Sequence, residues 1–180
     1  MKIDKSWTLF LDRDGVINNK LRYDYVKSVA EFEFLPGVKD ALKKLSGIFV
    51  RVIVITNQQG IGKGAMRMED LNKIHEYMMA EFKAHGGEIH KIYFCPDLAG
   101  TFSENRKPEI GMAMMAKKDF PEIDFEKTIM VGDSKTDMEF AKKLGMIAVF
   151  ISNGKEAKFY TNCLCDYVFN TLKEFSESIQ

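Results

Sequence analysis

The chain has 180 residues, of which 46% are hydrophobic and 29% are charged, and 26 basic residues balance 26 acidic ones. This length corresponds to one domain, and so large an apolar fraction excludes a disordered chain. A net charge of zero counts against nucleic acid or an anionic membrane as a partner, because both usually require a basic excess. We therefore expect a single domain over residues 1–180, a monomer or small homo-oligomer that binds neither.

The N-terminal residues and the cysteines bear on the compartment. Lys2, Asp4 and Lys5 are out of place in an export signal. The longest nearly unbroken apolar run, residues 144–151, is far shorter than the roughly 20 residues of a membrane-spanning helix. Three cysteines are an odd number, and without an export signal we expect no disulfides. These features favour a cytoplasmic protein.

Apolar periodicity predicts alternating strands and helices. In chain order these are a strand at 8–11, a helix at 36–45, a strand at 50–55, a helix at 68–84, a strand at 92–95, a helix at 109–120, a strand at 128–131, a helix at 134–144, strands at 147–151 and 167–169, and a helix from about 171. This alternation is typical of an α/β fold with a doubly wound, Rossmann-like, mostly parallel sheet and helices on both faces.

Polar side chains follow four of the predicted strands. They are Asp12 and Asp14, then Thr56 and Asn57, then Lys107, and then Asp133 and Asp137. In such sheets the ligand site lies beyond the carboxyl ends of the strands, so these groups should meet at one rim. Clustered carboxylates require a cation, and hard oxygen ligands favour Mg²⁺. A divalent cation, an ammonium and a hydroxyl together suit a phosphoryl group.

The strongest single motif is Asp12-Arg13-Asp14-Gly15. Two carboxylates separated by one residue at the end of a strand can take different roles in phosphoryl transfer. One attacks phosphorus, and the other protonates the leaving oxygen and then activates water. An Asx-rich turn or a calcium loop is the alternative, although an EF-hand loop needs its glycine at the sixth position, whereas Gly15 follows Asp12 by three.

Four motifs together resemble those of the haloacid dehalogenase-like (HAD) phosphatases. They are Asp12-x-Asp14-Gly15-Val16, Thr56-Asn57-Gln58, Lys107-Pro108 and Gly132-Asp133-Ser134-Lys135-Thr136-Asp137. The resemblance covers residues 9–169. It is greatest to the branch that holds histidinol-phosphate and heptose-bisphosphate phosphatases, on residues 10–18, 32–38, 56–61 and 106–108.

The resemblance implies a role for each motif. Asp12 would be the nucleophile that forms an aspartyl-phosphate, and Asp14 the general acid and base. Thr56 would hydrogen-bond the phosphoryl oxygens, and Lys107 would neutralise their charge. The Mg²⁺ ion would be held by Asp12, the main-chain carbonyl of Asp14 and Asp133, with Asp137 in support.

Insert lengths predict that this chain lacks the cap domain found in many HAD phosphatases. From Asp14 to Thr56 there is room for a loop and one helix, and from Thr56 to Lys107 for a helix, a strand and a loop. The site should therefore be open. Specificity should then come from the loops at residues 18–34, 60–66 and 96–106.

Three residues are expected to border the substrate: Asn57, Lys63 and Arg106. The guanidinium of Arg106 would suit a second anionic group. Lys63 lies in Gly60-Ile-Gly-Lys-Gly64, which fails as a P-loop because Asn57 and Gly64 replace the required glycine and hydroxyl residue. For both Lys63 and Arg106 the alternative is an ordinary surface cation.

Members of this branch often carry a zinc loop before the Arg-Lys-Pro segment. This chain keeps Cys95, but has Asp97 at the histidine position and residues 103–105 without cysteine. One thiolate cannot build a tetrahedral zinc site, so no structural zinc is expected. The Cys163-x-Cys165 pair is assigned to core packing.

The remaining conspicuous side chains are given structural roles. The three histidines, His75, His85 and His90, are expected at the surface. Met112, Met114 and Met115 are expected to pack a helix, and Trp7 and the fourteen phenylalanines to join the core.

The leading hypothesis is a Mg²⁺-dependent phosphatase of a small phosphorylated metabolite, with D-glycero-D-manno-heptose 1,7-bisphosphate favoured. Histidinol phosphate is one alternative. A nucleic-acid 3′-phosphate is another, because polynucleotide phosphatases share a similar Thr-Asn-Gln segment. A non-enzymatic alternative is a signalling receiver domain, which surrounds a phosphorylatable Asp with Thr and Lys but needs no acid at the position of Asp14.

Overall fold

The computed structural model describes residues 3–155 and 164–179. Within them the strands are β1 (Thr8–Leu11), β2 (Arg51–Asn57), β3 (Lys91–Cys95), β4 (Thr128–Gly132), β5 (Ile147–Ile151) and β6 (Tyr167–Phe169). They form one parallel sheet in the order β3-β2-β1-β4-β5-β6. Every predicted strand is confirmed, with ends that move by at most two residues.

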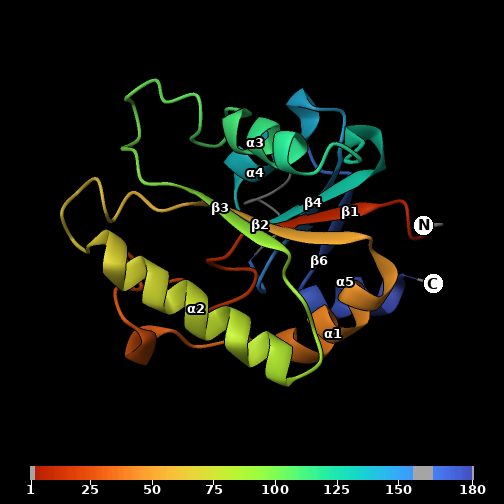
Figure 1. Ribbon diagram of the computed structural model, residues 1–180, viewed down its shortest axis with the longest axis horizontal. Coiled ribbons are helices and arrows are strands. Elements are labelled where there is room, and N and C mark those ends of the chain that lie inside the picture. The colour runs from red at the N-terminus through yellow and green to blue at the C-terminus, as the bar shows by residue number, and fades with distance from the viewer. Residues whose placement is uncertain (1–2, 156–163, 180) are drawn as a thin grey trace.

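The α-helices are α1 (Val38–Ile48), α2 (Met68–Ala84), α3 (Gly111–Asp119), α4 (Lys135–Lys143) and α5 (Leu172–Ser178). Two short 3₁₀ turns, η1 (Val29–Glu31) and η2 (Phe125–Lys127), lie in the connections. Figure 1 shows α3 and α4 on one face of the sheet and α1, α2 and α5 on the other. The doubly wound α/β fold predicted from the sequence is therefore confirmed.

Alternation along β1 divides the core into two layers. Leu9 and Leu11 join the apolar cluster under α1, α2 and α5, whereas Phe10 joins the cluster under α3 and α4. All three side chains are fully buried. A strand covered on both faces has little room for polar side chains, which explains why residues 9–11 are all apolar.

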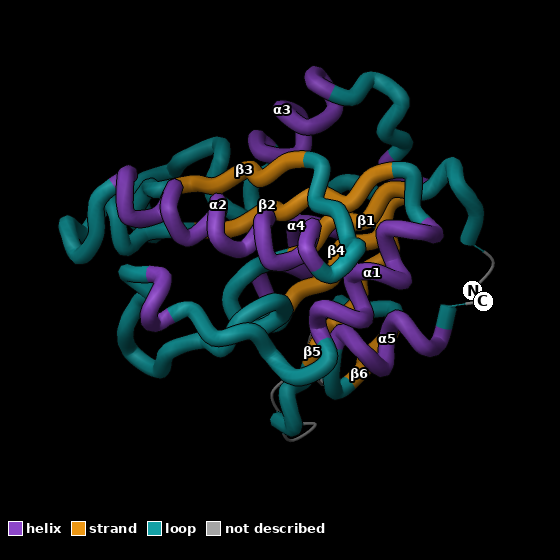
Figure 2. The backbone as a smooth tube through the Cα atoms, turned by 60° about the horizontal axis from the view of Figure 1, so that its bottom comes forward, coloured by secondary structure: helices purple, strands orange, loops and turns teal. Residues whose placement is uncertain are grey.

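The chain winds outward through β2 and β3, then returns to the other side of β1 to form β4, β5 and β6. The winding direction thus reverses between β1 and β4, and this is where open α/β sheets place their ligands. Asp12 follows β1 at this point, and its main-chain N–H donates to the carbonyl of Val131 at 2.9 Å. Figures 1 and 2 show the loops that follow β1, β2 and β3 gathered at the same end of the sheet.

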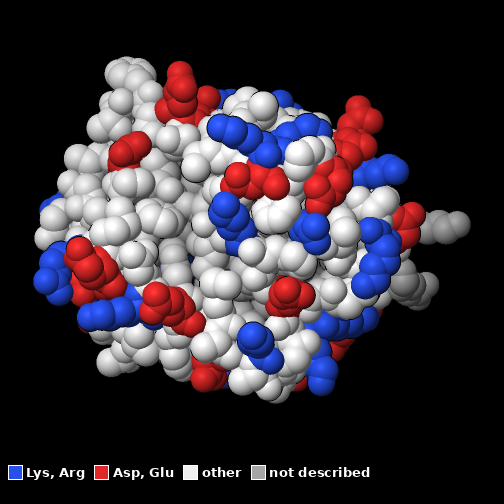
Figure 3. All heavy atoms as spheres, viewed as in Figure 1, with Lys and Arg blue, Asp and Glu red and all other residues white. Residues whose placement is uncertain are grey.

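The connections on either side of β2 contain no cap domain, as predicted. Residues 12–50 are described throughout and contain only η1 and α1, and residues 58–90 contain only α2. No helix in the described part of the chain is both long enough and apolar enough to cross a membrane. On the face seen in Figure 3, basic and acidic side chains are interspersed.

Several side-chain placements differ from prediction. His75 is buried, because it shares the inner stripe of α2 with Leu71, Ile74, Met78 and Phe82 at helical spacing. Phe102 is 98% exposed in the loop between β3 and α3, where no element covers it. Met114 and Met115 are each 49% exposed, since the short helix α3 buries only one face.

The other cysteine and histidine predictions have mixed outcomes. Cys165 packs against the apolar cluster under α3 and α4 as expected, whereas Cys163 lies outside the described residues. His85 is exposed and pairs with Asp40. His90 is half-buried, and its Nδ1 accepts from the main-chain N–H of Val52 at 3.1 Å.

Candidate active site

Three carboxylates meet where the winding reverses. Asp12 follows β1, Asp133 follows β4, and Asp137 lies in the first turn of α4; their carboxylate oxygens lie within 4.8 Å of one another. All three residues are buried. Three hard oxygen donors at this spacing suit Mg²⁺, so the donor set fits the predicted ion.

Two glycines make room for these carboxylates. A Cβ atom on Gly132 would lie 2.2 Å from the Cβ of Asp137, and one on Gly15 would lie 2.4 Å from Oδ2 of Asp133. Gly15 also has a φ of +86°, in the left-handed region that favours glycine. A side chain at either position would displace an acidic group.

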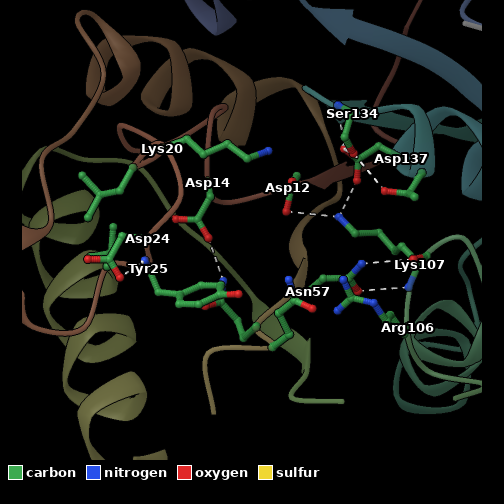
Figure 4. A pocket seen from close by; sticks show the side chains of 15 residues that line it. Asp12, Asp14, Lys20, Asp24, Tyr25, Asn57, Arg106, Lys107, Ser134 and Asp137 are labelled. Carbon is green, nitrogen blue, oxygen red and sulfur yellow. Dashed lines mark hydrogen bonds and ion pairs between the residues drawn. The ribbon is translucent and has the colours of Figure 1, made fainter. Parts of the chain in front are cut away.

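Lys107 lies between two of the acids. Its Nζ lies 3.1 Å from Oδ1 of Asp12 and 2.5 Å from Oδ1 of Asp137, and it donates to the carbonyl of Ile55 at 2.7 Å. Figure 4 shows both acids converging on this ammonium. Burial raises the pKa of Asp12, and the Lys107 charge opposes that effect. Burial lowers the pKa of Lys107, but the two carboxylates outweigh it, so that its pKa is raised.

The loop that carries Lys107 is tied to the end of β2 by Asn57. The Asn57 side chain accepts from the main-chain N–H of Lys107 at 3.0 Å and donates to its carbonyl at 3.1 Å. Asn57 also lines the cavity beside the acids, where it was predicted to meet the substrate. Its visible task is to position Lys107.

Asp137 has a second function at the start of α4. Its Oδ2 accepts from the main-chain N–H of Ser134 at 3.1 Å and from the Ser134 hydroxyl at 2.5 Å, which forms a capping box. The same carboxylate therefore fixes the helix end and pairs with Lys107. Its supporting role at the Mg²⁺ ion stays a prediction.

Asp14 faces the same cavity from the turn after β1. Both its oxygens accept from Nη2 of Arg13 at 2.9 Å, Oδ1 also accepts from Asn18 at 2.9 Å, and Oδ2 from Gln58 at 2.8 Å. Burial alone would raise the pKa of Asp14, but the Arg13 charge and these hydrogen bonds outweigh it and hold the pKa below its usual value. The Asp14 side chain is thus held in its carboxylate form.

Two further lysines, neither of them predicted from the sequence, approach the acidic cluster. Nζ of Lys20 lies 2.8 Å from Oδ1 of Asp133, and Nζ of Lys155 lies 3.3 Å from Oδ2. The negative charge of the cluster attracts these ammonium groups as it would a metal ion. No local pattern marks them, because each belongs to a loop that meets Asp133 only in the folded chain.

A cavity of about 230 Å³ opens over these groups. Among its lining residues are Asp12, Asp14, Lys20, Asp24, Tyr25, Asn57, Arg106, Lys107 and Asp137 (Figure 4). Thr56 does not line it; its buried hydroxyl accepts from the Gln58 side chain at 3.0 Å. Lys63 also lies outside, with its ammonium 5.4 Å from the centre of the Tyr25 ring. The 18–34 loop lines the cavity, whereas the 60–66 loop does not.

Arg106 reaches the cavity from a loop with its own hydrogen bonds. Its Nη1 donates to the carbonyl of Asp97 at 3.0 Å. The Asp97 carboxylate accepts from the Ser103 hydroxyl at 2.5 Å and from the Cys95 thiol at 3.4 Å. These contacts connect the two ends of the 96–106 loop. The absence of zinc stays a prediction.

The burial of His75 predicts a pH-dependent stability. Burial, with the Arg13 guanidinium nearby, lowers the pKa of His75 from 6.5 to about 3. Below pH 6.5 His75 is therefore protonated in the unfolded chain but stays neutral in the folded chain. The free energy of unfolding should decrease as the pH is lowered. Between pH 7 and 5.5 the wild-type chain should lose about 1 kcal/mol more unfolding free energy than His75→Gln, measured by urea denaturation. Equal losses would contradict this assignment.

Comparison with known proteins supports the geometric interpretation. Residues 104–175 match the model of a family described as HAD-hydrolase-like. The D-glycero-alpha-D-manno-heptose-1,7-bisphosphate 7-phosphatase of Mycobacterium bovis is 34% identical over 173 residues, covering 96% of this chain and 91% of the relative. The D-glycero-beta-D-manno-heptose-1,7-bisphosphate 7-phosphatase of Yersinia pestis is 32% identical over 180 residues, covering 96% and 94%.

A solved structure agrees with both relatives. The D,D-heptose 1,7-bisphosphate phosphatase of B. bronchiseptica, complexed with magnesium and phosphate, superposes with a TM-score of 0.84 at 28% identity and covers 98% of this chain and 97% of that one. The sequence identity, the coverage of both chains and the shared fold together support one family assignment. The chain is a phosphatase and belongs to the HAD-like hydrolases, in the family of the heptose-1,7-bisphosphate phosphatases.

Proposed function

We propose that this phosphatase removes the 7-phosphate of D-glycero-D-manno-heptose 1,7-bisphosphate, with Mg²⁺ as its cofactor and Asp12 as its nucleophile. One observation carries the proposal: Asp12, Asp14 and Lys107 face one cavity beside a three-carboxylate cluster. Relatives with this activity in their names match nearly the whole chain. These names include both the alpha and the beta anomer, so both anomers are substrates to test.

In the first step an oxygen of Asp12 attacks phosphorus, and the bond from phosphorus to the sugar oxygen breaks. Asp14, a carboxylate before substrate binds, takes up a proton from the monoanionic phosphate ester and gives it to that oxygen as the alcohol leaves. In the second step Asp14 takes a proton from water, whose oxygen attacks the phosphorus on Asp12. The bond from phosphorus to Asp12 breaks, inorganic phosphate leaves with the proton that Asp14 took from water, and Asp14 is a carboxylate again.

Around these steps the surrounding residues stabilise charge. Lys107 holds its ammonium 3.1 Å from Oδ1 of Asp12 and so faces the phosphoryl group that Asp12 receives. Asp12, Asp133 and the main-chain carbonyl of Asp14 would hold Mg²⁺, with Asp137 in support. The ion, when bound, would offset the negative charge on the phosphoryl oxygens. Thr56 remains a proposed phosphoryl contact.

The proposal predicts a narrow substrate preference that depends on metal. In a phosphate-release assay the wild-type chain should hydrolyse one anomer of the heptose bisphosphate at least about tenfold better, in kcat/KM, than histidinol phosphate or a 3′-phosphorylated oligonucleotide. Excess chelator should abolish release, and added Mg²⁺ should restore it. A preference for histidinol phosphate or the oligonucleotide would show that the heptose bisphosphate is not the substrate. Turnover unaffected by chelator would show that Mg²⁺ is not required.

Arg106 is expected to recognise the second phosphate. Its guanidinium lines the cavity and retains donors beyond the one given to Asp97. Arg106→Met should raise KM for the bisphosphate about 10- to 100-fold, as expected for a lost charge-assisted hydrogen bond. KM for heptose 7-phosphate, which lacks that group, should change little. Equal effects on both substrates would show that Arg106 does not read the second phosphate.

A further inference from the structure

Arg13 lies between Asp12 and Asp14 in the sequence and is 1% exposed. Its Nη2 donates to both oxygens of Asp14 at 2.9 Å. Its Nη1 lies 3.4 Å from Nε2 of His75 in helix α2. A guanidinium removed from water requires partners for its charge and its donors. In the described part of the chain Asp14 and His75 serve Nη2 and Nη1, whereas Nε has no hydrogen-bond partner.

His75 connects Arg13 to the body of the protein. It lies on the buried stripe of α2, and its ring centre is 5.7 Å from that of Phe94 in β3. With a pKa near 3 the ring is neutral, so Nε2 can accept a hydrogen bond from Arg13. The sequence places His75 62 residues after Arg13, and the fold brings them together.

We propose that Arg13 and His75 are positioning residues for Asp14, which hold its carboxyl group where it exchanges a proton with the leaving oxygen and with water. The inference rests on the proposed phosphatase chemistry and extends it to two residues that do not line the cavity. His75 orients Arg13, and Arg13 grips both oxygens of Asp14. Asn18 and Gln58 complete the set of donors around the carboxylate.

The position of Asp14 affects the breaking of one bond, that from phosphorus to the leaving oxygen. When the bond from phosphorus to the leaving oxygen breaks, that oxygen takes the bonding electron pair and needs the proton of Asp14. A leaving oxygen that is a weak base can depart without it, whereas a strongly basic one cannot. Misplacing Asp14 should therefore slow substrates with basic leaving groups far more than substrates with weakly basic ones.

Phenyl phosphate and p-nitrophenyl phosphate provide a matched pair, because they are similar in size and differ in leaving-group basicity. His75→Leu and Arg13→Met should lower kcat for phenyl phosphate at least about tenfold more than for p-nitrophenyl phosphate. Asp14→Asn should show the same bias, more strongly. His75→Gln retains an acceptor near the position of Nε2 and should keep a wild-type ratio. KM should change little in all of them.

Two controls separate positioning from damage to the fold. Ile74→Ala removes a buried side chain beside His75 in α2 and should lower both rates by the same factor, if at all. Arg13→Lys keeps the charge but has only one nitrogen to offer, so it should show an intermediate bias even if Arg13→Met does not fold. Equal losses on both aryl phosphates in His75→Leu and Arg13→Lys would overturn the inference.

The outcomes also distinguish this inference from the proposed function. Wild-type turnover of aryl phosphates without turnover of the heptose bisphosphate would remove the substrate proposal and leave the positioning test intact. Turnover of the bisphosphate, together with unbiased losses in the variants, would remove the positioning roles and leave the function. A wild-type chain that hydrolyses neither aryl phosphate, and no bisphosphate, would remove both.

Discussion

Asp12→Asn is expected to lower kcat for every phosphomonoester by at least about 10⁴-fold, because the amide cannot form the phosphorylated intermediate. Acid-quenched reactions with ³²P-labelled substrate should show a labelled wild-type chain and an unlabelled variant. Substrate should still bind, since Arg106 and Lys107 remain in the cavity. The loss should therefore appear in kcat far more than in KM.

The folded state of this variant should be intact. Asp12 is buried, and the pKa raised by that burial means that its charge is costly to keep in the folded chain. A neutral amide of the same shape removes that cost, while Lys107 keeps Asp137 as its partner. Asp40→Asn, at an exposed site on α1, is the matched control and should retain full activity. Full turnover in Asp12→Asn would mean that another group attacks phosphorus.

The fold and most of the acidic site could be predicted because both follow local rules. The strands β1, β2 and β4 are short apolar runs that end at polar residues, and those polar residues include Asp12, Asn57 and Asp133. Asp12 and Asp133 could be found by this rule alone, since the carboxyl ends of parallel strands share one edge. Asp137 lies one helical turn further on, in a capping box with Ser134.

The rest of the site depends on contacts between distant segments. Lys20 approaches Asp133 across 113 residues, and Arg13 approaches His75 across 62. The spacing of apolar residues on α2 places position 75 on the buried face of the helix. His75 was nevertheless predicted at the surface, because histidine is a polar residue. Lys63, by contrast, lies in a glycine-rich turn that was predicted to border the substrate, yet its ammonium lies over Tyr25 outside the cavity.

Lys107→Met is expected to lower both stability and activity. It removes the only ammonium within 4 Å of both Asp12 and Asp137 among the described residues, and it leaves two buried carboxylates facing each other. Breaking a buried ion pair in this way typically costs about 3–5 kcal/mol of unfolding free energy. Urea denaturation without Mg²⁺ should show a loss of that size. The rate should fall by about 10²- to 10³-fold, because the phosphoryl charge loses its nearest protein cation.

Added Mg²⁺ separates the two effects of this substitution. A cation held by the acids would replace part of the missing charge, so it should stabilise Lys107→Met more than it stabilises the wild-type chain. The double variant Lys107→Met/Asp137→Asn removes one of the stranded charges and should recover part of the stability without Mg²⁺. It should not recover the rate, because the ammonium beside Asp12 is still missing. A Lys107→Met chain as stable as the wild type would show that the buried acids do not depend on this ammonium, and that its charge serves the reaction alone.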